Sequence, residues 1–315
     1  MNATKSLRLT CPEDLIAAAP SLLGFYPQNS VVLITAGSPS FQARVDLPEI
    51  DDPDDHVEQV THLLVTPVMR HGIQAVVLLY YCNDKERAAR QNASLYAALQ
   101  AEGVRVPEVL FVTGTHYWSF LAPDMEPQPY DVSGHELLAE TVYTGRTIEA
   151  DRSALDEEVA QDSAAAAQIE ATLSEVRLES GANEAVWASR TLAALVEADG
   201  TPDDRTTARL ILGLARGEVR DVHWVEHSGP DAAAHARVWA GVLRRTPTNH
   251  QPAVGSVVAM LRFRSGDGAR AWCALDVHEG THQHSLGTLV HDLLASGASP
   301  SEVDQCWSTA PGESA

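Results

Sequence analysis

The segment HEGTH at residues 278–282 matches the pattern HExxH, in which two histidines four residues apart enclose a glutamate. On a helix this spacing puts both imidazoles on one face, where they can bind zinc beside a glutamate base. Glu302 follows at a distance from which it could supply a third ligand. Because Gly280 interrupts the motif and Ser285 is a typical helix cap, His278 and His282 are expected to lie across a turn. We therefore expect no metal at these residues, and a zinc peptidase is only a remote alternative.

Asp84 and His116 form a second arrangement that could do chemistry. Each residue follows closely on a segment with the apolar composition of a buried strand. Because a carboxylate can orient an imidazole for base catalysis, the pair could serve a hydrolase or a transferase. His116 can equally begin an edge strand whose aromatic residues only pack, and this structural interpretation is the favoured one.

Other catalytic signatures are missing from the sequence. There is no phosphate loop of the type GxxxxGKS/T, and Lys5 and Lys85 are the only lysines. No GxGxxG motif follows an expected strand, and no GxSxG segment offers the nucleophile of an α/β-hydrolase. We therefore expect no cofactor, and the sequence leaves open whether the protein is an enzyme.

Charge and composition limit the partners. Lys and Arg number 22 against 43 Asp and Glu, which gives a formal net charge of -21. A chain that is acidic in both halves is a poor partner for nucleic acid, because phosphate neutralisation supplies most non-specific affinity. The longest apolar run, residues 75–82, is too short to span a bilayer, and the N-terminus has no apolar leader. We expect a cytoplasmic protein that binds neither nucleic acid nor membrane.

One segment departs from this acidic character. Between Arg244 and Arg270 the chain contains three further arginines, Arg245, Arg262 and Arg264, and Asp267 is the only acidic residue among them. We expect these arginines to form a solvated helix face, with an anion-binding site as the alternative.

The first half, residues 1–150, has the pattern of an α/β domain. Apolar and alternating segments predict a hairpin of strands at 31–34 and 41–47, strands at 76–82, 109–112 and 114–121, and helices between them. The strand, helix and strand from residue 76 onward imply a parallel pair with a right-handed crossover, within a mixed sheet. Ligands bind outside the carboxyl ends of such strands, which makes Asn83, Thr113 and Thr115 candidate ligand-binding residues.

The second half, residues 151–315, is expected to be all helical. Good helix formers dominate residues 153–179, and further helices are expected at 184–198, 205–216 and 231–245. Toward the C-terminus, apolar segments centred near residues 238, 254, 271 and 286 are separated by turns that contain Pro or Gly. This spacing predicts helix hairpins, either in an ordinary helical packing, which is favoured, or in tetratricopeptide-like repeats.

Four segments, in this order, carry a resemblance to a known family: DLIAAAPSLLGFYPQNSVVLI at 14–34, ARVDLP at 43–48, VRDVHWV at 219–225 and GDGARAWCALD at 266–276. Together they resemble the actinobacterial domain of unknown function family 4192, across nearly the whole chain. The resemblance implies no established activity, cofactor or catalytic residue. It directs attention to residues 23–30 and 44–47, to Arg220 with Asp221, and to residues 266–268.

Each of these blocks also has a structural interpretation. Arg44 and Asp46 share one face of an expected strand, and Arg220 and Asp221 could clamp a domain interface. We favour structure over chemistry for them, because paired charges more often hold a fold together than catalyse. The four residues stay candidates for ligand binding.

Two hypotheses of function follow. The first is a non-enzymatic binding or regulatory protein whose C-terminal helices offer a surface to a protein partner, and it rests on the hairpin spacing and the missing catalytic motifs. The alternative is a protein that binds a small molecule, or an enzyme of the hydrolase or transferase type, with its site at the strand ends of the first half.

Overall fold

The computed structural model describes residues 9–37 and 41–309. By its internal contacts the chain divides into two compact units, Met1–Arg152 and Ser153–Ala315. None of the described helices is long and apolar enough to cross a bilayer.

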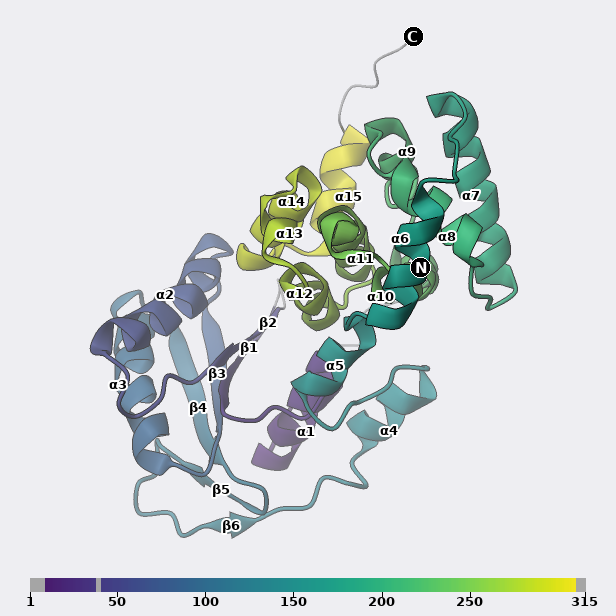
Figure 1. Ribbon diagram of the computed structural model, residues 1–315. Helices are drawn as coiled ribbons and strands as arrows, with labels where there is room; N and C mark the ends of the chain where they lie inside the picture. Colours follow the sequence, from purple (N-terminus) through teal and green to yellow (C-terminus); the bar gives the residue numbers. More distant parts are fainter. Residues whose placement is uncertain (1–8, 38–40, 310–315) are drawn as a thin grey trace. The chain divides into compact units, whose positions relative to one another are not determined.

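A mixed sheet of six strands forms the centre of the first unit (Figure 1), with the strand order β2-β1-β3-β4-β5-β6. Strands β3 and β4 pair in parallel, and every other neighbouring pair is antiparallel. The predicted hairpin and the predicted parallel pair are therefore both confirmed. The strands are β1 (Ser30–Thr35), β2 (Gln42–Asp46), β3 (Ala75–Tyr81), β4 (Arg105–Val112), β5 (His116–Ser119) and β6 (Gln128–Pro129).

Helices cover both faces of this sheet. On one face α2 (Asp54–Arg70) and α3 (Lys85–Ala101) lie side by side in Figure 1, and their Leu64 and Leu95 join Leu78 and Phe111 of the strands in one buried cluster. On the other face the phenol of Tyr81 donates to the Ile16 carbonyl of α1 (Pro12–Leu23), at 3.4 Å. The short helix α4 (Glu136–Tyr143) packs against α1.

Strand β3 is buried along its whole length, because both faces of the sheet are covered around it. This burial accounts for the continuous apolar run at residues 75–82, since a strand with no wet face has no need for polar alternation. Tyr81 pairs with Val112 of β4, so the two parallel strands end at the same level. The carboxyl ends of β3 and β4 therefore lie next to each other at one edge of the unit.

The second unit is helical throughout its described residues, as the sequence predicts. Residues 153–179 form two helices rather than one, because the Asp162 carboxylate accepts from the amides of Ala164 and Ala165 and starts a new helix. The helices are α5 (Arg152–Val159), α6 (Ser163–Leu173), α7 (Gly181–Glu197), α8 (Asp204–Gly213), α9 (Gly217–Asp221), α10 (Gly229–Arg244), the 3-10 turn η1 (Thr248–His250), α11 (Gln251–Arg264), α12 (Gly268–Asp276), α13 (Glu279–Gln283), α14 (Ser285–Ala295) and α15 (Pro300–Thr309).

Helix α11 is the central helix of the second unit. It packs against α10, α12, α13 and α14, and its middle residues, from Val254 to Leu261, are all buried. In a tetratricopeptide solenoid each hairpin contacts only the hairpins next to it in the sequence. Here α12, α13 and α14 all pack against α11. The hairpins therefore form a compact helical domain, which is the favoured interpretation of their spacing.

Three of the five arginines of residues 244–270 do not form the solvated face that the sequence suggests, whereas Arg244 is exposed. Arg270 makes a two-pronged ion pair with Glu158, with its Nη2 2.6 Å from Oε1 and its Nε 2.8 Å from Oε2. Arg262 lies 3.5 Å from the same carboxylate, and Arg264 pairs with Asp304 at 3.0 Å. The side chains of these three arginines are between 6% and 12% exposed, so their ion pairs link helices in the interior of the unit rather than at its surface. Arg270 also lies 3.3 Å from Asp267, but the partners Glu158 and Asp304 could not be found from the sequence because they come from α5 and α15.

Gly287 lies at a point of very close helix approach. A Cβ at this position would lie 1.8 Å from the carbonyl oxygen of Thr281, which is backbone and has little room to move. Only glycine fits where α14 crosses the end of α13.

We expect Gly287→Ala to lower the free energy of unfolding of the second unit by about 3 kcal/mol, the upper end of the cost of overpacking. Gly241→Ala is the matched control, because it lies on α10 with no atom within 4 Å of the added Cβ. This control should be stabilising by about 0.5–1 kcal/mol, as expected for alanine in a helix. Chemical denaturation monitored by circular dichroism measures both, and equal midpoints for the two variants would contradict the close approach.

Candidate functional site

A cleft of about 500 Å³ opens at the carboxyl ends of β3 and β4. This is where the architecture of a parallel strand pair places a ligand site. Five segments of the first unit line it: Ile16 and Pro20 of α1, and residues 26–29, 81–83, 112–114 and 130–133.

Two of the predicted ligand-binding residues lie in this cleft. Asn83 and Thr113 follow β3 and β4 directly, and both line it. Thr115 does not line the cleft, and its hydroxyl is hydrogen-bonded to His116 Nδ1 at 2.9 Å. The hydroxyl of Thr113 donates to the His116 carbonyl at 3.0 Å, which fixes the turn between β4 and β5. Of the three residues predicted from the strand ends, Asn83 and Thr113 therefore line the cleft and Thr115 does not.

The turn that leads into β1 forms one wall. Residues 26–29 line the cleft, and Asn29 has φ 45°, a left-handed conformation that asparagine tolerates better than most residues. Arg44, which is largely buried, donates from Nη2 to the Gln28 carbonyl at 3.1 Å and pairs with Asp46 at 2.6 Å. Arg44 and Asp46 therefore stand behind the wall, where Arg44 holds the backbone of the turn in place.

Residues 130–133 form another wall of the cleft, and they are not among the candidates predicted from the sequence. The Tyr130 phenol donates to the Thr113 carbonyl at 2.7 Å, and the Asp131 carboxylate accepts from the Ser133 amide at 2.9 Å. Both bonds tie the loop to itself and to the end of β4. The local signal that could have revealed it is the string DVS, because Asp followed two residues later by Ser is typical of an Asx turn.

Asp131 is the only charged side chain among the cleft residues. It is exposed, and hydrogen bonds from Ser133 hold its pKa below the usual range, so it is a carboxylate at neutral pH. Burial raises the pKa of Tyr81 and of Tyr130, so both phenols are neutral hydrogen-bonding groups. Burial also raises the pKa of the Cys82 thiol, which makes it a poor nucleophile. The lining suits a neutral or cationic polar molecule.

The structure gives Asp84 and His116 separate partners. Asp84 caps α3, and its Oδ1 accepts from the amides of Glu86 and Arg87 at 2.9 and 3.0 Å. No hydrogen bond or ion pair joins Asp84 to His116 in the described part of the chain. Asp84 thus starts a helix and His116 starts β5, which is not the expected edge strand, because β6 pairs with it on the side away from β4.

The HEGTH segment does not form a zinc-binding helix. His278 precedes α13, and its Nδ1 accepts from the Gly280 amide at 2.9 Å, so it acts as the helix cap. His282 Nε2 faces Asp276 at 3.1 Å, and the Glu302 carboxylate accepts from the Ser299 amide at 2.7 Å. Each of the three proposed ligands therefore has its own structural partner.

Arg220 and Asp221 pair with each other rather than across a domain interface. Arg220 Nε lies 2.8 Å from Asp221 Oδ1, and Arg220 Nη1 donates to the Ser285 hydroxyl at 3.3 Å. Asp221 Oδ1 also accepts from the Trp224 indole at 3.3 Å. All of these partners lie within the second unit, where the pair connects the end of α9 to the start of α14.

Among the described residues, His227, Asp231 and His235 are the group whose ligand atoms lie close enough to share a metal ion. These three residues are not among the candidates predicted from the sequence. The signal was present as a histidine, an aspartate and a histidine at successive intervals of four residues, which is one face of a helix.

We expect Asp84→Ala to lower the free energy of unfolding by about 1 kcal/mol, the usual cost of losing a helix cap. Asp84→Ser should retain most of the wild-type stability, because serine caps helices about as well as aspartate. Thermal and urea unfolding of the full chain measure the difference. If both variants were as stable as the wild type, the carboxylate would not be acting as a cap.

Comparison with known proteins concerns the chain as a whole. No curated protein and no solved structure matches it. Residues 12–301 match the model of the family described as Domain of unknown function (DUF4192), a stretch that includes residues of both compact units. The chain therefore belongs to the DUF4192 family.

Proposed function

We propose that this protein binds a small polar molecule, neutral or cationic, in the cleft at the carboxyl ends of β3 and β4. The observation that carries the proposal is the composition of the cleft, which gathers amide and hydroxyl side chains from four separate segments around one carboxylate. A concave site with a few convergent polar groups on an apolar base is the usual form of a small-molecule site.

The polar side chains support this choice of ligand. Gln28, Asn29 and Asn83 offer amides that can both donate and accept, and Thr113 and Ser133 offer hydroxyl groups. The cleft residues include no Lys, Arg or His, so an anionic group would meet Asp131 with no cation to offset it. The net charge of -21 adds to the repulsion of anions and favours the approach of cations.

The hypothesis of a protein partner on the C-terminal helices has less support. The large apolar side chains exposed in the described part of the second unit are Val186, Val225 and Leu289, and they come from three different elements. Single exposed apolar residues are normal on a protein surface and mark no docking patch. The cleft is therefore the better starting point for function.

We expect a thermal-shift screen of the full chain to find stabilising ligands among neutral and cationic metabolites, and fewer among phosphates and carboxylates. Asp131→Asn should weaken a cationic ligand about tenfold or more, since hydrogen bonds to charged groups contribute about 1.5–3 kcal/mol. Asn83→Ala should weaken neutral and cationic ligands alike. Titration calorimetry of each hit with these variants gives the affinities.

Asp124→Asn is the matched control, because Asp124 is an exposed aspartate of the preceding loop and does not line the cleft. It should bind every hit with wild-type affinity. A screen in which only anions stabilise the protein, or hits that bind the Asp131 and Asp124 variants equally well, would contradict the proposal.

A further inference from the structure

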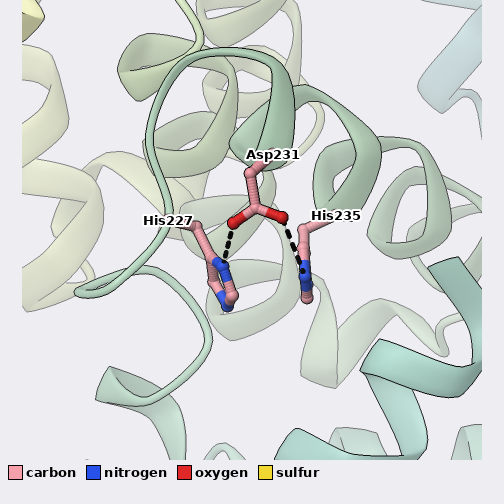
Figure 2. A group of neighbouring side chains, drawn as sticks. All are labelled: His227, Asp231 and His235. Atoms are coloured by element: carbon pink, nitrogen blue, oxygen red, sulfur yellow. Dashed lines mark hydrogen bonds and ion pairs between the residues drawn. The ribbon is translucent and has the colours of Figure 1, made fainter. Parts of the chain in front are cut away.

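A histidine cluster at the start of α10 has no part in the cleft. His227 lies in the turn before the helix, Asp231 in its first turn and His235 one turn further on. Figure 2 shows the Asp231 carboxylate between the two imidazoles, with one oxygen directed to each ring. The interval of four residues places Asp231 and His235 on one face of α10, and the turn before the helix brings His227 beside them.

The distances are those of ligands that could converge on one ion. Asp231 Oδ2 lies 2.5 Å from His227 Nδ1, and Asp231 Oδ1 lies 3.8 Å from His235 Nε2. One ligand atom from each residue lies within 4.8 Å of the other two. The two rings stack with centroids 3.7 Å apart and an interplanar angle of 23°. Because the lone pair of an imidazole lies in the ring plane, the two stacked rings must rotate apart to bring their nitrogens and the carboxylate to the roughly 2 Å bonds that zinc makes.

The state of His235 favours coordination. It is 5% exposed, its Nδ1 has no hydrogen-bond partner, and its Nε2 is too far from Asp231 for a direct hydrogen bond. A buried imidazole with unmet bonding capacity is unusual in a site with no further role.

Neighbouring residues hold the backbone of His227 in place and leave the Asp231 carboxylate accessible to solvent. The buried guanidinium of Arg264 donates from Nε to the backbone carbonyl of His227, and its charge is paired with Asp304. The side chain of Asp231 is 57% exposed, so an ion can enter from solvent and keep water in its remaining positions.

We propose that His227, Asp231 and His235 bind one divalent transition-metal ion, of which Zn²⁺ is the reference. Two imidazoles and one carboxylate are a donor set that suits zinc and its neighbours in the first transition row. Three protein ligands leave at least one position for water or an exogenous ligand, as in metal sites that act on a bound molecule.

A second histidine pair in the same unit provides a control within the chain. His282 and His291 have centroids 5.6 Å apart and rings nearly perpendicular, and His282 faces Asp276. Their side chains are 34% and 43% exposed, so this pair lacks the buried ring of the proposed site. It represents an ordinary surface pair with the same residue types.

The test is a titration of the EDTA-treated, dialysed full chain with Zn²⁺, followed by calorimetry and by metal analysis after gel filtration. We expect one ion per chain. His227→Ala and Asp231→Asn should each weaken binding at least about tenfold, because even the loss of an outer partner of a metal ligand has an effect of about that size. His291→Ala should bind as the wild type does. Neither ligand variant removes a fully buried side chain, so circular dichroism should show both folded.

A second measurement uses Co²⁺ as a spectroscopic probe. The wild type and His291→Ala should show the visible absorption of a cobalt ion with nitrogen ligands, and His227→Ala should lose it. Absence of stoichiometric Zn²⁺ in the wild type would overturn the proposal. Wild-type affinity in both ligand variants, or an equal loss in His291→Ala, would show adventitious surface binding only and would overturn it as well.

Discussion

The parallel pairing of β3 and β4 is the constraint on which the first unit depends. Both strands are covered by helices on two faces, so most of their backbone groups must pair with each other and with β1 and β5. A parallel pair needs a long crossover, and α3 supplies it, starting at the Asp84 cap. The two strand ends therefore stop at the same level, and the residues after them have room to form a cleft.

In the second unit the main constraint is the burial of α11, which is surrounded by other helices. Helices packed this closely need residues without a Cβ where they touch. Gly255 of α11 lies next to a carbonyl group of α12, and Gly287 of α14 lies next to a carbonyl group of α13. The charged residues around this core are paired across long distances in the sequence. Arg270 reaches Glu158, 112 residues away, and the buried Glu184 carboxylate of α7 receives two hydrogen bonds from Arg209 of α8. Such pairs can brace the helices because neither charge is left uncompensated.

The two candidate sites differ in how they are built. The cleft is assembled from loops that meet at a sheet edge, and its polarity comes from neutral groups around one carboxylate. The histidine cluster is built on a single helix and the turn before it, and its character comes from a buried imidazole beside an exposed carboxylate. The first arrangement favours selection among polar molecules by hydrogen bonding, and the second favours an ion.

The sequence by itself determined the class of secondary structure in each half, the parallel strand pair and the position of Asn83 and Thr113 at its end. These features follow from hydrophobic periodicity and turn residues, which act over a few neighbouring positions. It did not determine the partners of Arg262, Arg264 and Arg270, the wall at residues 130–133, or the capping roles of Asp84 and His278. Only the tertiary structure decided those. They depend on which distant segments pack together, and on which backbone amides lack a backbone partner and are hydrogen-bonded by a side chain instead.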